Sequence, residues 1–369
     1  MNKIPCVIMR TGTSKGVFFK HEDMPKEKNK WNDFLLDVMG SPDARQIDGL
    51  GGANSLTSKV AIIKKSNKEE YDIEYTFAQV SLTDRVVDFK GNCGNVSSGV
   101  GPFAINEGFV EITNPKTKVR ILNTNTNKLI VSEVEIENGK SKISGETYIP
   151  GAPSPGSPIY LSFYNSEGAV TGKLLPTGNV IDCIETSIGK INISIVDAAN
   201  PLVFMNAKDI GLKGTELPEE LTRENLNLIE EIRSIATEMC GFAIKEEATK
   251  KSPSVPKATI ITESTEYVDL SGNKRNKEEM DIVVRMISMQ KPHKALAITG
   301  AVCITAAASI KGTLVNKLIK VNNDKIKIAH PGGILDTFSK VDTGKIEYIR
   351  VVRTARRIMD GYVYTKQKY

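Results

Sequence analysis

The chain has 369 residues, of which 40% are hydrophobic and 25% charged, proportions that are ordinary for a soluble globular protein of two or three domains. The formal net charge of +5 slightly favours anionic ligands, but basic residues form no long run and do not alternate with aromatic residues, which argues against a nucleic-acid partner. No apolar segment approaches membrane-spanning length, and the first residues lack the layout of a signal peptide, so we expect a cytoplasmic protein without a membrane partner.

Cysteine and histidine are too sparse and scattered to suggest a metal centre. The five cysteines lie far apart without a Cys-x-x-Cys pair, which argues against a disulfide framework and a cysteine-based zinc site. None of the three histidines stands at metal-ligand spacing from another. These residues are Cys6, Cys93, Cys183, Cys240, Cys303, His21, His293 and His330. We therefore expect neither a metal nor a cofactor.

The first half of the chain predicts strands, small-residue loops and one amphipathic helix. The helix is expected at residues 31–39, where Trp31, Phe34, Leu35 and Val38 fall on one face. The expected strands are 6–9, 17–19, 59–63, 75–80 and 85–89, with polar loops at 10–16 and 49–58.

Residues 91–101 place one thiol, that of Cys93, in a run of Gly, Asn and Ser. Small residues leave backbone N–H groups open to a ligand, and Asn95 or Ser97 can cap the helix expected to follow. The partial positive charge at a helix N-terminus favours a thiolate and also binds carboxylates. This stretch therefore predicts a thiol that transfers a proton, next to a binding site for an anionic substrate.

The second half repeats this order of elements. The repeat comprises a strand at 191–196, a loop at 197–201, a strand at 202–205, a helix at 225–239, a strand within 254–261, and a loop at 297–303 that opens a helix at 304–310. Two halves of like design are the simplest explanation, and coincidence between generic α/β segments is the alternative.

Segments rich in Pro, Gly and Ser at residues 148–158 and 173–179 predict loops between the halves. We place the boundary near residue 183, so that residues 1–182 form the first half and residues 183–349 the second. Residues 350–369 are expected to return to the first half as a last strand.

Four motifs together point to a family. They are Met9-Arg10-x-Gly12-Thr13-Ser14-Lys15-Gly16-Val17-Phe18-Phe19, Thr57-Ser58-Lys59-Val60-Ala61, Cys93-Gly94-Asn95-x-Ser97-Ser98-Gly99-Val100-Gly101-Pro102-Phe103-Ala104 and Arg353-Thr354-Ala355-Arg356-Arg357. The chain resembles the 2-methylaconitate cis-trans isomerase and 3-methylitaconate delta-isomerase family over nearly its whole length. The resemblance implies a diaminopimelate-epimerase-like α/β (α+β) fold: two pseudo-symmetric halves, each with a sheet wrapped round a central helix, and an active site in the cleft between them.

The resemblance also implies site residues. Lys59 and Cys93 are expected to be the acid/base pair, with Ser14 close to them, and which of the pair is the base stays open. The expected substrate-binding residues are Thr13, Gly94, Asn95, Lys257, Thr299, Gly300, His330, Gly332 and Gly333. Epimerases of this fold carry a second cysteine in the second-half loop, where this chain has Ala297-Ile298-Thr299-Gly300 with Cys303 beyond it, so a two-thiol racemase is disfavoured.

Structural roles are the alternative for each residue. Cys93 would then be a small packing residue and Lys59 a solvated strand end. His293 and His330 would be hydrogen-bonded structural histidines. The arginines of the last motif would form a solvated basic face, unless one binds a carboxylate bidentately.

We expect an isomerase that shifts a C=C bond in a small methyl-branched unsaturated dicarboxylate, of the type 3-methylitaconate to 2,3-dimethylmaleate, by cofactor-free proton transfer. The alternatives with the same chemistry are a 2-methylaconitate cis-trans isomerase and a 4-oxalomesaconate tautomerase. An alternative of another class is a non-catalytic carboxylate-binding accessory protein. The expected partner is a small anionic carboxylate, and a homo-oligomer is left open.

Overall fold

The structure is a computed structural model that describes residues 2–319, 324–342 and 345–369. Contacts within the chain divide it into two units: unit 1 is Met1–Ser162 with Val352–Tyr369, and unit 2 is Phe163–Val351. The first boundary lies earlier than residue 183 because the intervening segment is hydrogen-bonded to unit 2. For example, the Ala199 N–H donates to the Ser166 carbonyl (2.7 Å), and the Gly168 N–H donates to the Asp197 carbonyl (2.8 Å).

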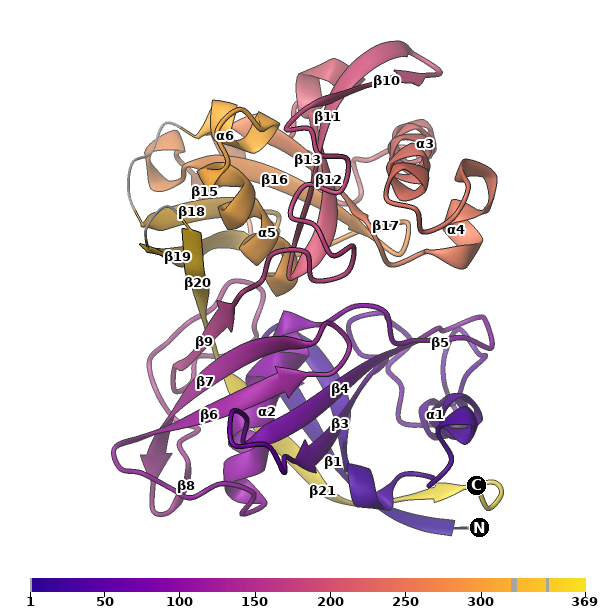
Figure 1. The fold of residues 1–369 in the computed structure, drawn as a ribbon, viewed down its shortest axis with the longest axis vertical. Coiled ribbons are helices and arrows are strands. Elements are labelled where there is room, and N and C mark those ends of the chain that lie inside the picture. The colour runs from indigo at the N-terminus through magenta and orange to yellow at the C-terminus, as the bar shows by residue number, and fades with distance from the viewer. Residues whose placement is uncertain (1, 320–323, 343–344) are drawn as a thin grey trace. The chain divides into compact units, whose positions relative to one another are not determined.

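Unit 1 is built on one mixed sheet (Figure 1). Its elements are β1 (Asn2–Thr11), β2 (Ser14–Lys20), α1 (Trp31–Met39), β3 (Lys59–Lys65), β4 (Ile73–Val80), β5 (Val87–Asp88), α2 (Gly94–Asn106), β6 (Lys116–Asn123), β7 (Lys128–Glu137), β8 (Lys140–Ser141), β9 (Ile159–Tyr164, which the boundary crosses) and β21 (Ala355–Thr365). β1 lies antiparallel to both β2 and β21. From β2 the pairing continues parallel to β3, antiparallel to β4, parallel to β6 and antiparallel to β7.

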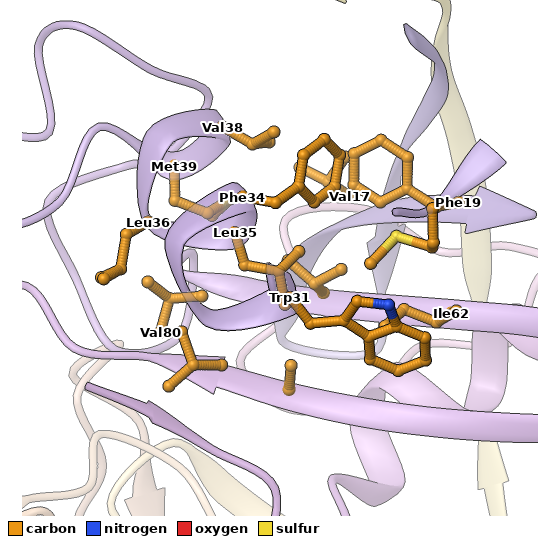
Figure 2. Close-up of a cluster of buried hydrophobic side chains, with 14 of the residues drawn as sticks. Val17, Phe19, Trp31, Phe34, Leu35, Leu36, Val38, Met39, Ile62 and Val80 are labelled. Carbon is orange, nitrogen blue, oxygen red and sulfur yellow. The ribbon is translucent and has the colours of Figure 1, made fainter. Parts of the chain in front are cut away.

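Helix α1 covers part of this sheet with the face that its sequence predicts. Trp31, Phe34, Leu35 and Val38 are all buried, and they pack with side chains from β2, β3 and β4 (Figure 2). The helix ends at Gly40, whose φ of 73° is the left-handed conformation that glycine adopts most readily at a helix C-terminus. The apolar periodicity of this segment therefore predicted both the helix and its buried face.

Helix α2 is the centre of unit 1. Every residue from Gly94 to Ile105 is buried, and the helix contacts strands β1, β2, β3, β4, β6, β7, β8 and β21. A Cβ atom on Gly99 would lie 2.6 Å from Thr11 Cγ2, and one on Gly101 would lie 2.4 Å from Ser132 Oγ. The small residues that predicted a ligand-binding loop thus also let the sheet close around the helix.

Unit 2 repeats this pattern. Its elements are β10 (Asp182–Thr186), β11 (Gly189–Ala198), β12 (Asn200–Asn206), α3 (Arg223–Met239), α4 (Ala248–Lys251), β13 (Lys257–Glu263), β14 (Tyr267–Val268), β15 (Lys274–Arg275), β16 (Ile282–Ser288), β17 (Lys291–Pro292), α5 (Ile298–Ser309), α6 (Leu314–Leu318), β18 (Lys325–His330), β19 (Gly333–Asp342) and β20 (Lys345–Arg353, which the second boundary crosses). From β11 the pairing runs antiparallel to β12, parallel to β13, antiparallel to β16, parallel to β18 and antiparallel to β19.

The order of antiparallel and parallel pairings is therefore the same in both units. In each unit a peripheral helix (α1 or α3) follows the second strand of this series, and a central helix (α2 or α5) precedes its fifth. Helix α5 is apolar on all sides and buried from Ile298 to Ala307, as a central helix must be. These findings confirm the predicted α/β fold with two halves of like design. Among the helices in the described ranges, none combines the length and apolar character needed to cross a membrane.

Candidate active site

Two of the predicted residues stand where parallel strands of unit 1 begin. Ser14 is the first residue of β2 and Lys59 is the first residue of β3. The two strand starts are close, because a Cβ atom on Gly16 would lie 3.3 Å from the Lys59 carbonyl oxygen. Both side chains are buried, and the Ser14 hydroxyl has no hydrogen-bond partner.

Lys59 is 7% exposed, and its side chain faces an amide instead of a carboxylate. Its Nζ donates to Gln79 Oε1 (2.5 Å) and lies 5.3 Å from the centroid of the Phe77 ring. Gln79 Nε2 donates to the carbonyls of Ser55 (3.1 Å) and Ser58 (3.0 Å), which directs its oxygen towards the amine. No ion pair found in the described part of the chain includes Lys59. A buried ammonium without a carboxylate carries a desolvation cost, so this position favours an incoming anion.

Cys93 is the N-cap residue of α2, half-buried and free of any disulfide. The helix begins at Gly94, so the prediction that Asn95 or Ser97 caps it is wrong. Because the whole run of small residues is buried, the helix starts up to about a turn earlier in the chain than expected. No side chain caps this end, and no acceptor is found in the described structure for the N–H groups of Gly94, Asn95 and Val96. Unpaired N–H groups at a helix start form an anion-binding site.

Asn95 joins the start of α2 to the hairpin between β1 and β2. Its Nδ2 donates to Thr13 Oγ1 (3.1 Å), and its Oδ1 accepts the Thr13 N–H (3.4 Å) and Arg353 Nη2 (3.1 Å). Gly12 has a φ of 55°, and a Cβ atom there would lie only 2.2 Å from Asn95 Oδ1. Thr13, Ser14, Cys93, Gly94 and Asn95 are therefore held at one end of unit 1.

The C-terminal arginines do not form a single basic face. Arg356 is exposed, and Arg357 pairs with Glu107 (2.5 Å) and Asp360. Arg353, by contrast, is only 2% exposed. Burial and the charge of Arg10 lower the pKa of Arg353 to about 9, whereas the negative charge of Cys93 acts to raise it. Sequence reasoning did not separate Arg353 from its neighbours and did not find Gln79.

In unit 2, α5 begins at Ile298, one to two turns before the expected start at residue 304. Ala297 is its N-cap residue and supplies no capping side chain, and the described structure offers no acceptor for the N–H groups of Ile298, Thr299 and Gly300. Ala297 thus stands where Cys93 stands in unit 1. Cys303 lies inside the helix, where its thiol donates to the Val196 carbonyl (3.2 Å) and burial raises its pKa.

The other unit 2 candidates lie at two separate turns of the sequence. Lys257, like Lys59, opens the strand after a peripheral helix, and its Nζ donates to the Ser254 carbonyl (2.9 Å). His330 Nδ1 accepts the Gly332 N–H (3.1 Å), so this N–H is engaged within its own turn and does not face outwards as expected. Gly333 begins β19, and its carbonyl accepts the Tyr267 hydroxyl (3.0 Å).

His293 Nδ1 accepts the Ala295 N–H (3.0 Å), which resembles the turn at His330. No group of three or more His, Cys, Asp or Glu side chains is arranged to hold a metal ion within the ranges that the structure describes.

The fold places the protein in a structural class. A hydroxyproline epimerase from Agrobacterium vitis matches 98% of this chain and 92% of its own with a TM-score of 0.57 and 13% identity, so the likeness concerns the fold alone. This is the diaminopimelate-epimerase-like class expected from the sequence. Within it, the chain belongs to the PrpF protein family, whose model matches residues 1–366.

Several relatives align over the whole chain. The "Putative isomerase YraM" of Bacillus subtilis is 56% identical over 369 residues, covering 100% of this chain and 99% of the relative. The 3-methylitaconate isomerase of Eubacterium barkeri is 48% identical over 371 residues, covering 99% and 98%. A crystal structure of methylitaconate-delta-isomerase is 48% identical, with a TM-score of 0.84 over 99% of this chain and 96% of that one.

More distant relatives carry other names. The 2-methyl-aconitate isomerase of Shewanella oneidensis is 36% identical, covering 98% of this chain and 96% of its own. The 4-oxalomesaconate tautomerase of Pseudomonas putida is 35% identical with the same coverage.

Proposed function

We propose that this protein is an isomerase that shifts a C=C bond in a small methyl-branched unsaturated dicarboxylate, as in the conversion of 3-methylitaconate to 2,3-dimethylmaleate. The observation that carries the proposal is the end of unit 1, where a buried lysine without a carboxylate and a thiol at an uncapped helix start flank a hairpin with a free serine hydroxyl. The 48% identity to the 3-methylitaconate isomerase supports this substrate over those of the more distant relatives.

The reaction moves one proton and needs no redox step. One carrier removes the proton from the carbon that bears the methyl group, which is allylic and adjacent to a carboxylate. The C–H electron pair forms the new C=C bond, and charge spreads through a dienolate onto a carboxylate. The second carrier protonates the terminal methylene carbon, which becomes a methyl group, so the composition is unchanged. We assign the two carriers to Lys59 and Cys93, with Ser14 beside them.

Preoriented donors lower the energy of the dienolate because they do not reorganise during the reaction. In unit 1 the proposed donors for the substrate carboxylate are Thr13 and the N–H groups of Gly94 and Asn95. In unit 2 the proposed binding residues are Lys257, Thr299, Gly300, His330 and Gly333, whereas Gly332 is left out because its N–H donates to His330 Nδ1. The repeated fold supports this assignment, since the α5 start is uncapped like the α2 start.

Proton NMR in deuterated water tests the proposal. We expect purified protein that has been dialysed against a chelator to convert 3-methylitaconate with deuterium entering the new methyl group. Lys59→Ala and Cys93→Ser are expected to lower the exchange rate at least about 100-fold, the usual contribution of a positioned acid or base. Lys65→Ala on the exposed end of β3 and Cys183→Ser at an exposed site are matched controls that retain it.

The competing functions give different results in the same assay. Faster conversion of 2-methylaconitate or 4-oxalomesaconate would favour the alternative substrates, each of which carries a third carboxylate. Absence of exchange with every acid would favour a carboxylate-binding accessory protein. Full exchange in Lys59→Ala and Cys93→Ser would refute the assignment of the carriers while leaving the isomerase in place.

A further inference from the structure

We propose that Arg353 is a positioning residue for this reaction: it fixes the Asn95 side chain at the start of α2 and supplies the buried positive charge that accompanies Cys93. The inference rests on the proposed function and extends it to a residue that does not touch the substrate.

The first support is the hydrogen-bond chain from Arg353 to the hairpin. Arg353 Nη2 donates to Asn95 Oδ1 (3.1 Å), so this atom must be the amide oxygen. The amide nitrogen of Asn95 is thereby directed to Thr13 Oγ1 (3.1 Å). Without the guanidinium, the Asn95 amide can rotate so that its oxygen and nitrogen exchange places. The hydrogen bonds that join the start of α2 to the hairpin would then weaken.

The second support is a pair of arginines around Gly12. Arg10 Nη1 donates to the carbonyls of Gly12 (3.1 Å) and Thr354 (3.1 Å) and to Thr354 Oγ1 (3.0 Å). The Gly12 N–H donates to the Thr354 carbonyl (2.9 Å). The charge of the nearby Arg10 acts to lower the pKa of Arg353. Both therefore hold the same turn, which leads directly into Ser14.

The third support is the missing counter-charge. No ion pair in the described ranges includes Arg10 or Arg353, and the Nε atoms of both are buried without a partner. A buried guanidinium group (Arg353) and a half-buried one (Arg10) without an anion carry a desolvation cost. The Cys93 sulfur is a neighbouring group that can become negative, and its charge favours the charged form of Arg353. We therefore infer that a negative sulfur formed at Cys93 during proton transfer is attracted to the Arg353 guanidinium, which its hydrogen bond to Asn95 holds at the start of the same helix.

The test separates charge from packing with two variants. Arg353→Gln removes the charge and keeps an amide donor, whereas Arg353→Lys keeps the charge and loses the planar fork. Each protein, without substrate, is alkylated with iodoacetamide at pH 7.5, and labelling of the Cys93 peptide is measured by mass spectrometry against that of the exposed Cys183. The kinetics of the isomerase reaction are measured in parallel.

We expect Arg353→Gln to lower Cys93 labelling relative to Cys183 by about tenfold, the effect of removing one nearby charge on a thiolate population. Arg353→Lys should keep labelling near the wild-type rate and lower kcat more than it raises KM, because the charge remains while Asn95 is released.

Two results would overturn the proposal: unchanged Cys93 labelling in a folded Arg353→Gln protein, or an equal loss of labelling in Arg353→Lys. If circular dichroism shows that Arg353→Gln is unfolded, the Arg353→Lys result alone decides. Labelling needs no substrate, so it can fail while the isomerase activity stands, and it can hold where no isomerase activity is found.

Discussion

The amide of Gln79 offers a sharp test of the role of Lys59. Gln79→Glu keeps the size of the side chain but replaces its two N–H donors with a carboxylate oxygen. The carbonyls of Ser55 and Ser58 lose their donors, while Lys59 gains an ion-pair partner in place of a neutral acceptor. We expect this ion pair to occupy the charge of Lys59 that would otherwise meet the substrate.

The size of both effects follows from these contacts. Loss of two hydrogen bonds at about 0.5–1.5 kcal/mol each lowers the free energy of unfolding of unit 1 by roughly 1–3 kcal/mol, in part offset by the new ion pair. Loss of a proton carrier lowers the exchange rate by about 100-fold or more. Gln79→Met is the matched control, because it also removes both donors but adds no charge, and we expect it to retain most of the activity.

Urea unfolding and deuterium exchange measure the two effects separately. Trp31, the single tryptophan of the chain, lies in the core of unit 1, so its fluorescence reports the stability of this unit. Exchange is followed by proton NMR with 3-methylitaconate. If Gln79→Glu and Gln79→Met have equal stability and equal activity, a carboxylate beside Lys59 does no specific harm and the proposed role of Lys59 is refuted.

Two further predictions concern unit 2. Ala297→Ser should cap α5 and raise the free energy of unfolding by about 0.5–2 kcal/mol. It should also lower kcat/KM, because the added hydroxyl occupies N–H groups that are proposed to bind substrate. Thermal melts and kinetics measure the two effects, and an unchanged kcat/KM in a stabilised variant would contradict the prediction. Burial alone would raise the pKa of Asp269, but hydrogen bonds from Asn273, Arg275 and Ser271 hold it below its ordinary value. This carboxylate therefore stabilises the fold above the unfolded-state pKa near 3.9 and loses that contribution as pH falls through the lower folded pKa. Asp269→Asn should cost about 1–3 kcal/mol at pH 7 and progressively less below about pH 4, as measured by urea unfolding followed by circular dichroism; a cost that does not change with pH would contradict this assignment.

The fold was more accessible to sequence reasoning than the site. The periodicity of apolar residues predicted α1, and the repeated order of strands and helices predicted two units of like design. Both patterns can be recognised from residues that are close together in the sequence. The starts of α2 and α5 were placed too late, since burial within a closed sheet outweighs the loop preference of Gly and Ser. Cys93 and Lys59 were singled out by motif.

Gln79 and Arg353 were missed for a common reason. Gln79 reaches Lys59 through strand pairing across 20 positions, and Arg353 reaches Asn95 across 258 positions. Neither contact leaves a pattern in the neighbouring sequence. Arg353 also lies in a short basic run with Arg356 and Arg357. The sequence does not show that Arg353 is buried while Arg356 is exposed and Arg357 forms ion pairs.

The pairing of β1 with β21, from Asn2 opposite Thr365 to Thr11 opposite Ala355, has a consequence for synthesis on the ribosome. Unit 2 is one continuous segment, whereas unit 1 is built from residues on both sides of it, so β1 must wait for a partner strand that is synthesised after unit 2. Arg353 and Thr354, which hold the turn before Ser14, also arrive late. A nascent chain therefore carries its thiol and its lysine long before it can assemble them, because residues 353–365 must be made before β1 and the turn that leads to Ser14 are held in place.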